Sequence, residues 1–405
     1  MRNVLFLSVL MINLLGLTGC LNRSGKVSER AIPVMNMDVS YPQKEFALQD
    51  LGKVRYIRMD TTENALLDDG MRLSPSANGF IFYNPFSGSV VGYDKDGHLI
   101  CNFNHKGQGA NEYANINKLA YDEENGKIYI LPYGTKVNIL AFDLQGKCVQ
   151  SFSTPDTLIA TDMALFNSES LLVWDTKNFN VIKEGKISKL AEALPDPNPY
   201  PFVFLNTKDG ALDSRLSKAY PEHFRLLVFT IQDGAPFVMM AHTNTIVPSN
   251  NGFLLNDFVS DTVFWLSKDK EVKPVFTHTP SLHTNIPKRN VCEVWAMSSR
   301  FMLINVISLN LEEASTQTGL KTAWYLWDSN EQSFTQCTFY NADFKKAGET
   351  LRPTAVSGDK LYFRYFPSEL LEASEKQSLK GELETLTHSL DEDDNMILME
   401  VSLSD

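Results

Sequence analysis

The sequence has few of the residues that most often carry chemistry, and it lacks the spacings in which they act. Seven histidines occur in 405 residues, and no H-E-x-x-H segment or close histidine pair has metal-ligand spacing. There is no G-x-S-x-G turn and no P-loop. The segment Gly107-Gln108-Gly109 lacks the third glycine and the helix of a dinucleotide-binding loop. Nothing in the sequence therefore identifies an enzyme, and no metal site is predicted.

Cysteine is also scarce, and no C-x-x-C pair is present. The five cysteines are Cys20, Cys101, Cys148, Cys292 and Cys337. Their scattered positions exclude a zinc cluster. The last four stand in strand-like runs, where small apolar thiols are expected to be buried and free. Pairing in an oxidising compartment remains the alternative.

Positive charge is in deficit. The chain has 37 Lys and Arg against 49 Asp and Glu, and its net charge is −12. An acidic chain without a basic stripe is not suited to nucleic acid or to lying flat on anionic lipid. We expect a solvated acidic surface, no nucleic-acid partner and a monomer.

Long apolar runs are absent except at the N-terminus. After Arg2, a run from Val4 to Leu15 is too short to span a bilayer and has the form of a secretory signal. It ends in Leu17-Thr18-Gly19-Cys20, which resembles the bacterial lipobox. That resemblance implies that residues 1–19 are a lipoprotein signal peptide and that Cys20 carries the lipid. An ordinary signal followed by a chance cysteine is the alternative.

The residues after Cys20 refine the predicted location. No Asp follows the cysteine, and no acidic cluster resembles the surface-export signal of Bacteroidales lipoproteins. We therefore predict an outer-membrane lipoprotein that faces the periplasm rather than the cell surface. Residues 20–43 contain Pro33 and Pro42 with little apolar periodicity, as is typical of a tether. A folded domain is then expected at 44–405.

A repeated pattern dominates that domain: an apolar strand, a polar turn and a second strand that often ends in Phe. The turn is Asp94-Lys95-Asp96-Gly97 in one copy and Asp143-Leu144-Gln145-Gly146 in the next. Glycine supplies the positive φ that such a hairpin needs. Looser copies occur at 203–210, 263–269 and 324–330. A second pair of short strands precedes each copy, so each unit has the four strands of a propeller blade.

The units predict an all-β fold, a single six-bladed β-propeller of four-stranded blades. The blades are expected near 70–104, 113–153, 158–217, 244–277, 291–340 and 349–403. The last unit has three strands, and the alternating segment 53–59 is predicted to complete it and close the ring. Residues 180–202 are expected to be a loop, 218–243 an extra hairpin, and about 367–394 a helical insertion before the final strand.

Two segments resemble a known family. Asn104–Tyr113 is similar to the Gly-Arg-x-Gly-x-Gly-Pro-Gly-Glu-Tyr segment of six-bladed, NHL-like propeller lipoproteins of Bacteroidales, and Asp393–Met399 is similar to their Asp-Asn-Pro end strand. This chain departs from the family pattern at Asn104, His105, Ala110, Asn111 and Met396. The resemblance implies an NHL-like or TolB-like propeller and no settled activity.

Ligands of propellers bind at the mouth of the central channel, which is lined by the loops that enter each innermost strand. Asp68 and Asp69 lie in such a loop. The predicted ligand-binding residues of this channel face are Arg72, Lys106, Gln108, Glu112, Tyr113, Arg352 and Arg364. Lys106 in its Gly-flanked loop could hold an anion, or the loop could be a turn between blades. Glu112 and Tyr113 could act as an acid and a phenol, or they could seal two blades.

Three functions remain open. The first is a binding module of the cell envelope whose ligand is a protein, a peptide or a glycan. The alternative is a calcium-dependent enzyme acting on a sugar or lactone, with Asp175, Asn256 and Asp257 as candidate ligands by fold analogy. The third is a structural role in envelope assembly, suggested by analogy with TolB. No cofactor is predicted for the first function, and calcium belongs only to the second.

Overall fold

The computed structural model describes the chain from residue 31 onward. Side chains are described at 31–134, 137–176, 201–216, 244–257, 260–282, 284, 290–308, 321–345 and 350–405. Four further strands, at 180–183, 186–189, 224–232 and 235–240, are described by their backbone. The predicted signal peptide, Cys20 and the start of the tether lie outside these residues. All elements below belong to one unit, Ile32–Asp405.

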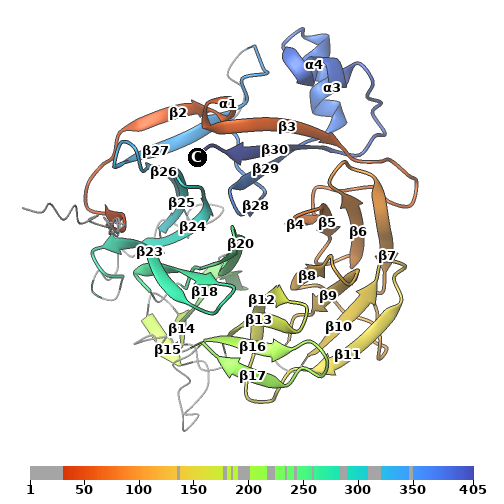
Figure 1. Ribbon diagram of the computed structural model, residues 1–405, viewed down its shortest axis with the longest axis vertical. Helices are drawn as coiled ribbons and strands as arrows, with labels where there is room; N and C mark the ends of the chain where they lie inside the picture. Colours follow the sequence, from red (N-terminus) through yellow and green to blue (C-terminus); the bar gives the residue numbers. More distant parts are fainter. Residues whose placement is uncertain are drawn as a thin grey trace, which may run out of the picture. The chain divides into compact units, whose positions relative to one another are not determined.

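Six four-stranded antiparallel blades form a ring, which confirms the predicted fold (Figure 1). Blades 1 to 3 consist of β4 (Arg72–Pro75), β5 (Gly79–Tyr83), β6 (Ser89–Asp94) and β7 (Leu99–Asn104); β8 (Lys118–Asp122), β9 (Lys127–Leu131), β10 (Asn138–Asp143) and β11 (Cys148–Ser153); and β12 (Ala160–Asn167), β13 (Ser170–Asp175), β16 (Phe202–Asn206) and β17 (Leu212–Arg215). In each blade the first strand is the innermost one.

Blades 4 to 6 follow the same order. They consist of β20 (Ile246–Ser249), β21 (Gly252–Leu255), β22 (Thr262–Ser267) and β23 (Val272–Thr279); β24 (Asn290–Met297), β25 (Phe301–Ser308), β26 (Thr322–Asp328) and β27 (Ser333–Tyr340); and β28 (Ala355–Ser357), β29 (Lys360–Tyr365), β30 (Ile397–Leu403) and β3 (Gly52–Arg58). The innermost strands β4, β8, β12, β20, β24 and β28 meet around the centre.

The ring is closed by the strand that the sequence predicted for this role. β3 pairs antiparallel with β30 along its whole length, from Gly52 opposite Leu403 to Arg58 opposite Ile397. Tyr56 and Ile57 are buried in two different clusters, on opposite faces of the strand, and Arg58 is exposed. Pairing the first long strand with the last removes the open edges that a ring would otherwise have at blade 6.

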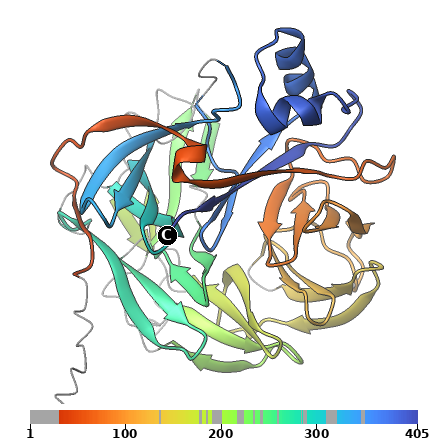
Figure 2. The same cartoon turned by 45° about the horizontal axis from the view of Figure 1, so that its top comes forward.

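Two short strands before β3 extend the outer edges of neighbouring blades. β1 (Val34–Asn36) pairs parallel with β23, and β2 (Gln43–Ala47) pairs parallel with β27 (Figure 2). The last part of the segment expected to be a tether is therefore bound to blade 4. Met35 explains the attachment, since its side chain is fully buried in the core next to Phe276.

An additional sheet interrupts blade 3. It contains β14 (Asn180–Lys183), β15 (Lys186–Lys189), β18 (Phe224–Gln232) and β19 (Ala235–Met240), in the order β15-β14-β18-β19. The hairpin expected within 218–243 is present as β18 and β19. The expectation that residues 180–202 form only a loop is wrong for 180–189, because β14 adds in parallel to the free edge of β18.

The hairpin turns follow from the repeated motif. Gly97 and Gly146 have φ of 92° and 78°, a region that favours glycine. The first residue of each turn caps the following backbone: Oδ1 of Asp94 accepts from the N–H groups of Asp96 and His98 at 2.9 Å. This combination bends the chain sharply between the third and fourth strands of a blade.

The helical insertion before the last strand is present as α3 (Pro367–Glu375) and α4 (Gly381–Thr387). Leu370 and Leu383 are fully buried in the core that includes Tyr56 and Tyr365. The helices therefore pack on the outer part of blade 6, beside β3 and β30 (Figure 1). A single turn, α1 (Leu48–Leu51), joins β2 to β3. No helix among the described residues is long and apolar enough to cross a membrane.

Candidate functional site

The innermost strands enclose a central cavity of about 860 Å³. Its wall is formed by β4, β8, β12, β20 and β28, with Trp295 of β24. Leu73, Val247 and Trp295 provide apolar surface, and charged side chains lie at both ends. A cavity of this volume, with a mixed wall, is suited to a small organic ligand or to a segment of a larger one.

Two cations begin neighbouring strands at one end of the cavity. Arg72 is the first residue of β4 and Lys118 the first of β8. Arg72 lies directly across the ladder from Tyr83. Burial lowers the pKa of Lys118, but the carboxylate of Asp162 and the nearby Tyr83 raise it more, so the net shift is upward. Lys118 is therefore held as a cation.

At this end of the cavity, Asp162 on β12 is the counter-ion of Lys118. Its Oδ1 lies 3.0 Å from Nζ of Lys118 and accepts from its neighbour's backbone N–H at 2.7 Å. Its Oδ2 accepts from the backbone N–H of Ile246, in blade 4, at 3.0 Å. The carboxylate thus links blades 2, 3 and 4, and both of its oxygens are already engaged.

Arg364, near the end of β29, lines the same cavity. Its guanidinium carbon lies 6.0 Å from the ring centroid of Phe82 in blade 1. Nε is buried, and within the described part of the chain it has no hydrogen-bond acceptor. Burial lowers the pKa of Arg364, while Asp68 and Asp69 raise it from a distance. Since arginine remains charged in proteins, the wall contains a cation without a close carboxylate among the described residues.

Glu293 lies behind the cavity wall on β24 and is completely buried. Nε1 of Trp295, a wall residue, donates to its Oε2 at 3.0 Å. Burial raises the pKa of Glu293 to about 7; the Trp295 indole and the Asn305 amide lower it, and the charge of Asp162 raises it further. A carboxyl group that titrates near neutrality thus contacts the channel through Trp295.

The acidic residues at the other end of the cavity hold turns in place. Asp122 accepts from the backbone N–H of Asn125 at 3.1 Å and from its side chain at 2.9 Å. Glu123 accepts two bonds of 2.8 Å from Asn78, which lies in the β4–β5 turn of blade 1. Glu123 thus joins blades 1 and 2, whereas Asp122 holds the β8–β9 turn of blade 2, and both carboxylates are engaged.

Of the predicted channel-face residues, Arg72 and Arg364 line the cavity, whereas Lys106, Gln108 and Arg352 are exposed outside its wall. Nζ of Lys106 donates to the backbone carbonyl of Phe86 at 2.6 Å. Phe86, at 74% exposure, is the most exposed of the large apolar side chains described.

Glu112 and Tyr113 also lie outside the cavity wall, and both organise their own loop. The carboxylate of Glu112 accepts from the N–H of Gly109 at 2.8 Å. The Tyr113 hydroxyl donates to Gly88 at 2.8 Å and accepts from the N–H of His105 at 3.1 Å. The Tyr113 ring packs edge-on against Phe142 of blade 2. This segment of the family-like motif therefore ties blade 1 to blade 2.

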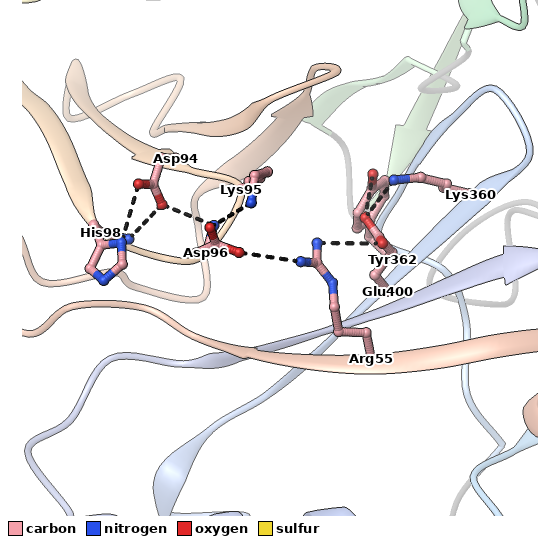
Figure 3. A network of polar contacts seen from close by, with 8 residues as sticks. All are labelled: Arg55, Asp94, Lys95, Asp96, His98, Lys360, Tyr362 and Glu400. Carbon is pink, nitrogen blue, oxygen red and sulfur yellow. Dashed lines mark hydrogen bonds and ion pairs between the residues drawn. The ribbon is translucent and has the colours of Figure 1, made fainter.

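A second cavity, of about 320 Å³, lies between blades 6 and 1 and has a basic wall that includes Lys53 and Lys95. Glu400 is the buried carboxylate of this wall. It lies 3.1 Å from Nζ of Lys360 and 3.4 Å from the guanidinium of Arg55. Figure 3 shows Arg55 between Glu400 and Asp96, which it approaches at 3.7 Å. This network couples the closing strand to the β6–β7 turn of blade 1.

Two of the candidate calcium ligands, Asp175 and Asn256, already form hydrogen bonds or ion pairs with other groups of the protein. Asp175 accepts from the N–H of Ile159 at 3.0 Å and pairs with Arg215 at 3.3 Å. The amide of Asn256 bonds to backbone groups at 2.8–2.9 Å. Neither these two nor Asp257 lines the central cavity. In the described part of the chain, no three His, Cys, Asp or Glu side chains gather as metal ligands would. The arrangement does not fit a calcium site.

Five residues at this site were not predicted from the sequence: Tyr83, Lys118, Asp162, Glu293 and Trp295. A signal for two of them was present, since Asp162 and Glu293 are charged residues inside otherwise apolar innermost strands. A charge in such a position is costly unless it is paired or serves the channel. Tyr83, Lys118 and Trp295 carry no such signal in the sequence, because their position at the cavity depends on the register of the strands.

Fold and cavity together define a six-bladed β-propeller with a ligand-sized central channel. A family model described as a domain of unknown function, DUF4934, matches residues 32–402. The chain therefore belongs to the DUF4934 family.

One solved structure agrees with the fold, and two others are similar to the chain at lower scores. A Bacteroides fragilis protein described as exported is 12% identical, with a TM-score of 0.61 over 93% of this chain and 100% of the other. A virginiamycin B lyase from Staphylococcus aureus is 9% identical, with a TM-score of 0.36 over 86% and 99%. A Bacteroides caccae protein of unknown function is 10% identical, with a TM-score of 0.32 over 67% and 88%. No curated protein matches the chain in sequence.

Proposed function

We propose that the chain is an exported, lipid-anchored binding module of the cell envelope. Its ligand, a peptide, a glycan or a segment of an envelope protein, occupies the central channel. The observation that carries this proposal is the cavity of about 860 Å³, whose wall combines apolar surface with the charged side chains of Arg72, Lys118 and Arg364. Rigid blades hold these groups in place before the ligand arrives, which lowers the entropic cost of binding.

Binding is a better account of this channel than catalysis. None of the described histidines lines the cavity. The carboxylates at its two ends, Asp162 and Glu123, are engaged in hydrogen bonds that join blades. Such groups position the wall and are poorly placed to exchange a proton with a substrate.

The envelope location rests on the N-terminal sequence. The lipobox-like residues before Cys20 support lipid attachment, and a protein of the same fold is described as exported. Several acyl chains on one cysteine would anchor the chain more firmly than the marginal binding of a single chain. The short strands β1 and β2 would then hold the propeller close to the end of the tether.

Two variants of the full chain test the two parts of the proposal. Cys20→Ser should move the protein from the membrane fraction to the soluble fraction; a variant that stays in the membrane would show that the anchor is wrong. Ser74→Trp should fill the channel, because Ser74 is a partly exposed wall residue on β4.

Ligands are sought by thermal shift with panels of peptides and oligosaccharides. A ligand that stabilises the wild type should not stabilise Ser74→Trp. The control is Ser151→Trp, which adds the same side chain to an exposed position on the outermost strand β11. If the ligands found bind Ser74→Trp as well as Ser151→Trp, the channel is not the binding site.

A further inference from the structure

At one end of the channel, two of three cations lack a close ion pair among the described residues. Arg72, Lys118 and Arg364 contribute three cations to the cavity wall. Asp162 neutralises Lys118 at 3.0 Å, and its second oxygen is occupied by the backbone of blade 4. No ion pair within 4.0 Å joins Arg72 or Arg364 to a carboxylate of the described residues. Two guanidinium groups therefore remain without a close counter-ion.

Asp68 and Asp69 form no close ion pair with Arg364. Asp68 and Asp69 influence it only through space. Both oxygens of Asp68 lie close to the side-chain amide of Asn84, at 3.1 and 3.3 Å. Nε of Arg364 is buried without an acceptor among the described residues. A buried N–H group without an acceptor is unfavourable, and an oxyanion of a ligand would supply the acceptor that Nε of Arg364 lacks.

The geometry at this end also limits the position of the missing group. Arg364 extends from blade 6 over Phe82 of blade 1. Arg72 stands opposite Tyr83 on the β4–β5 ladder. Tyr83 and Phe82 face opposite sides of blade 1, so Arg72 and Arg364 reach the same cavity from the two sides of this blade. The fork of a guanidinium matches the two oxygens of a carboxylate, sulfate or phosphate, and the tyrosine hydroxyl can donate a third bond.

We propose that the channel takes an anionic ligand, and that Arg72 and Arg364 clamp its carboxylate, sulfate or phosphate group at the end where Lys118 pairs with Asp162. The uncharged body of the ligand lies along the apolar wall, toward Trp295. This inference rests on the proposed function and gives the ligand its chemical class. The organic body can be a sugar acid or an acidic amino acid, since the clamp recognises only the oxyanion.

Titration calorimetry on the purified full chain tests the clamp. The probes are acetate, sulfate, inorganic phosphate and D-glucuronate, with glucose as the neutral match of glucuronate, all at one ionic strength. We expect at least one of the anions to bind and glucose not to bind measurably. Comparison of the anions distinguishes a carboxylate site from a sulfate or phosphate site.

Three variants locate the binding. Arg364→Met and Arg72→Met remove a guanidinium but keep an apolar stem, and each should weaken the anion by about tenfold or more. Arg364→Lys keeps the charge and loses the fork, so an intermediate loss is expected. The control is Lys273→Met, which removes one positive charge from an exposed position on the outer strand β23. Circular dichroism and thermal unfolding of each variant show whether its fold is intact.

The inference is wrong if none of the anions binds the wild type, or if both arginine variants bind them as tightly as Lys273→Met does. The proposed function does not depend on this result. A neutral ligand that is lost in Ser74→Trp, together with no anion binding, leaves the binding module intact and overturns only the clamp.

Discussion

Glu293 gives the strongest test of how the channel wall is built. Its carboxyl is completely buried, and its pKa rises to about 7 from an ordinary value of 4.5 because burial disfavours the ionised form. The contacts that favour ionisation, from Trp295 and Asn305, only partly offset this cost. Replacement by Gln keeps the shape of the side chain and an acceptor for the Trp295 indole but removes the charge.

The direction of the pH dependence follows from the linkage between proton binding and folding. A folded-state pKa above the unfolded value means that the native state binds the proton more tightly, so stability is complete below pH 4.5 and falls as the pH rises through 7. At about 1.4 kcal/mol for each pH unit between the two values, the wild type loses about 3 kcal/mol. Glu293→Gln carries no such penalty and should be the more stable protein at pH 8.

The assay is urea unfolding, followed by tryptophan fluorescence, at pH 5 and pH 8. We expect the difference between Glu293→Gln and wild type to move in favour of the variant by about 2–3 kcal/mol over this range. The control is Glu392→Gln, at an exposed position after α4, whose difference should not change. A difference for Glu293→Gln that is the same at both pH values would refute the reasoning, because the carboxyl would then be ionised in the native state at both.

Other predictions concern the closure of the ring and are measured by urea unfolding midpoints. Gly52→Ala should cost about 2 kcal/mol or more, because a Cβ at Gly52 would collide with the backbone carbonyl of Ser402 in the closing ladder. Asn395→Ala should cost about 3 kcal/mol, because its buried amide bonds to three backbone groups of the loop between β3 and β4 at 2.8 Å. Glu400→Gln should cost about 1 kcal/mol and less at high salt, since its partners Arg55 and Lys360 are each 36% exposed.

For each of these three variants, one result would contradict the prediction. An unchanged midpoint for Gly52→Ala would mean that β3 can move away from β30. Asn330→Ala, in an exposed turn of blade 5, is the control for Asn395→Ala, and equal losses would show that the amide network is unimportant. A salt-independent loss for Glu400→Gln would assign its effect to the hydroxyl of Tyr362, which donates to it at 3.2 Å, rather than to the charges.

The blades could be predicted because their signals are local. The Asp-x-x-Gly turns set the third and fourth strands of blades 1 and 2, and the lone alternating segment 53–59 had no other partner than the incomplete blade 6. The role of Asn395 in the closing motif was not visible, since its partners at Asp60, Leu67 and Ala65 lie more than 300 residues away in the sequence.

The channel was predicted less well, for a physical reason. Arg72 and Arg364 were found because they lie near the ends of recognisable strands. Lys118 and Asp162 meet across two blades, and their pairing depends on the register of both. The pairing of β1 with β23 was also missed, because a strand of three residues that follows Pro33 carries no periodicity.

The pairing of β1, β2 and β3 with blades 4, 5 and 6 has a consequence for the order of folding. These three strands precede the other described strands in the chain, yet their partners all lie in its second half, and the ladder of residues 52–58 waits for residues 397–403. Contacts so distant in sequence form late and slowly. The propeller can therefore be completed only after the whole polypeptide has been made.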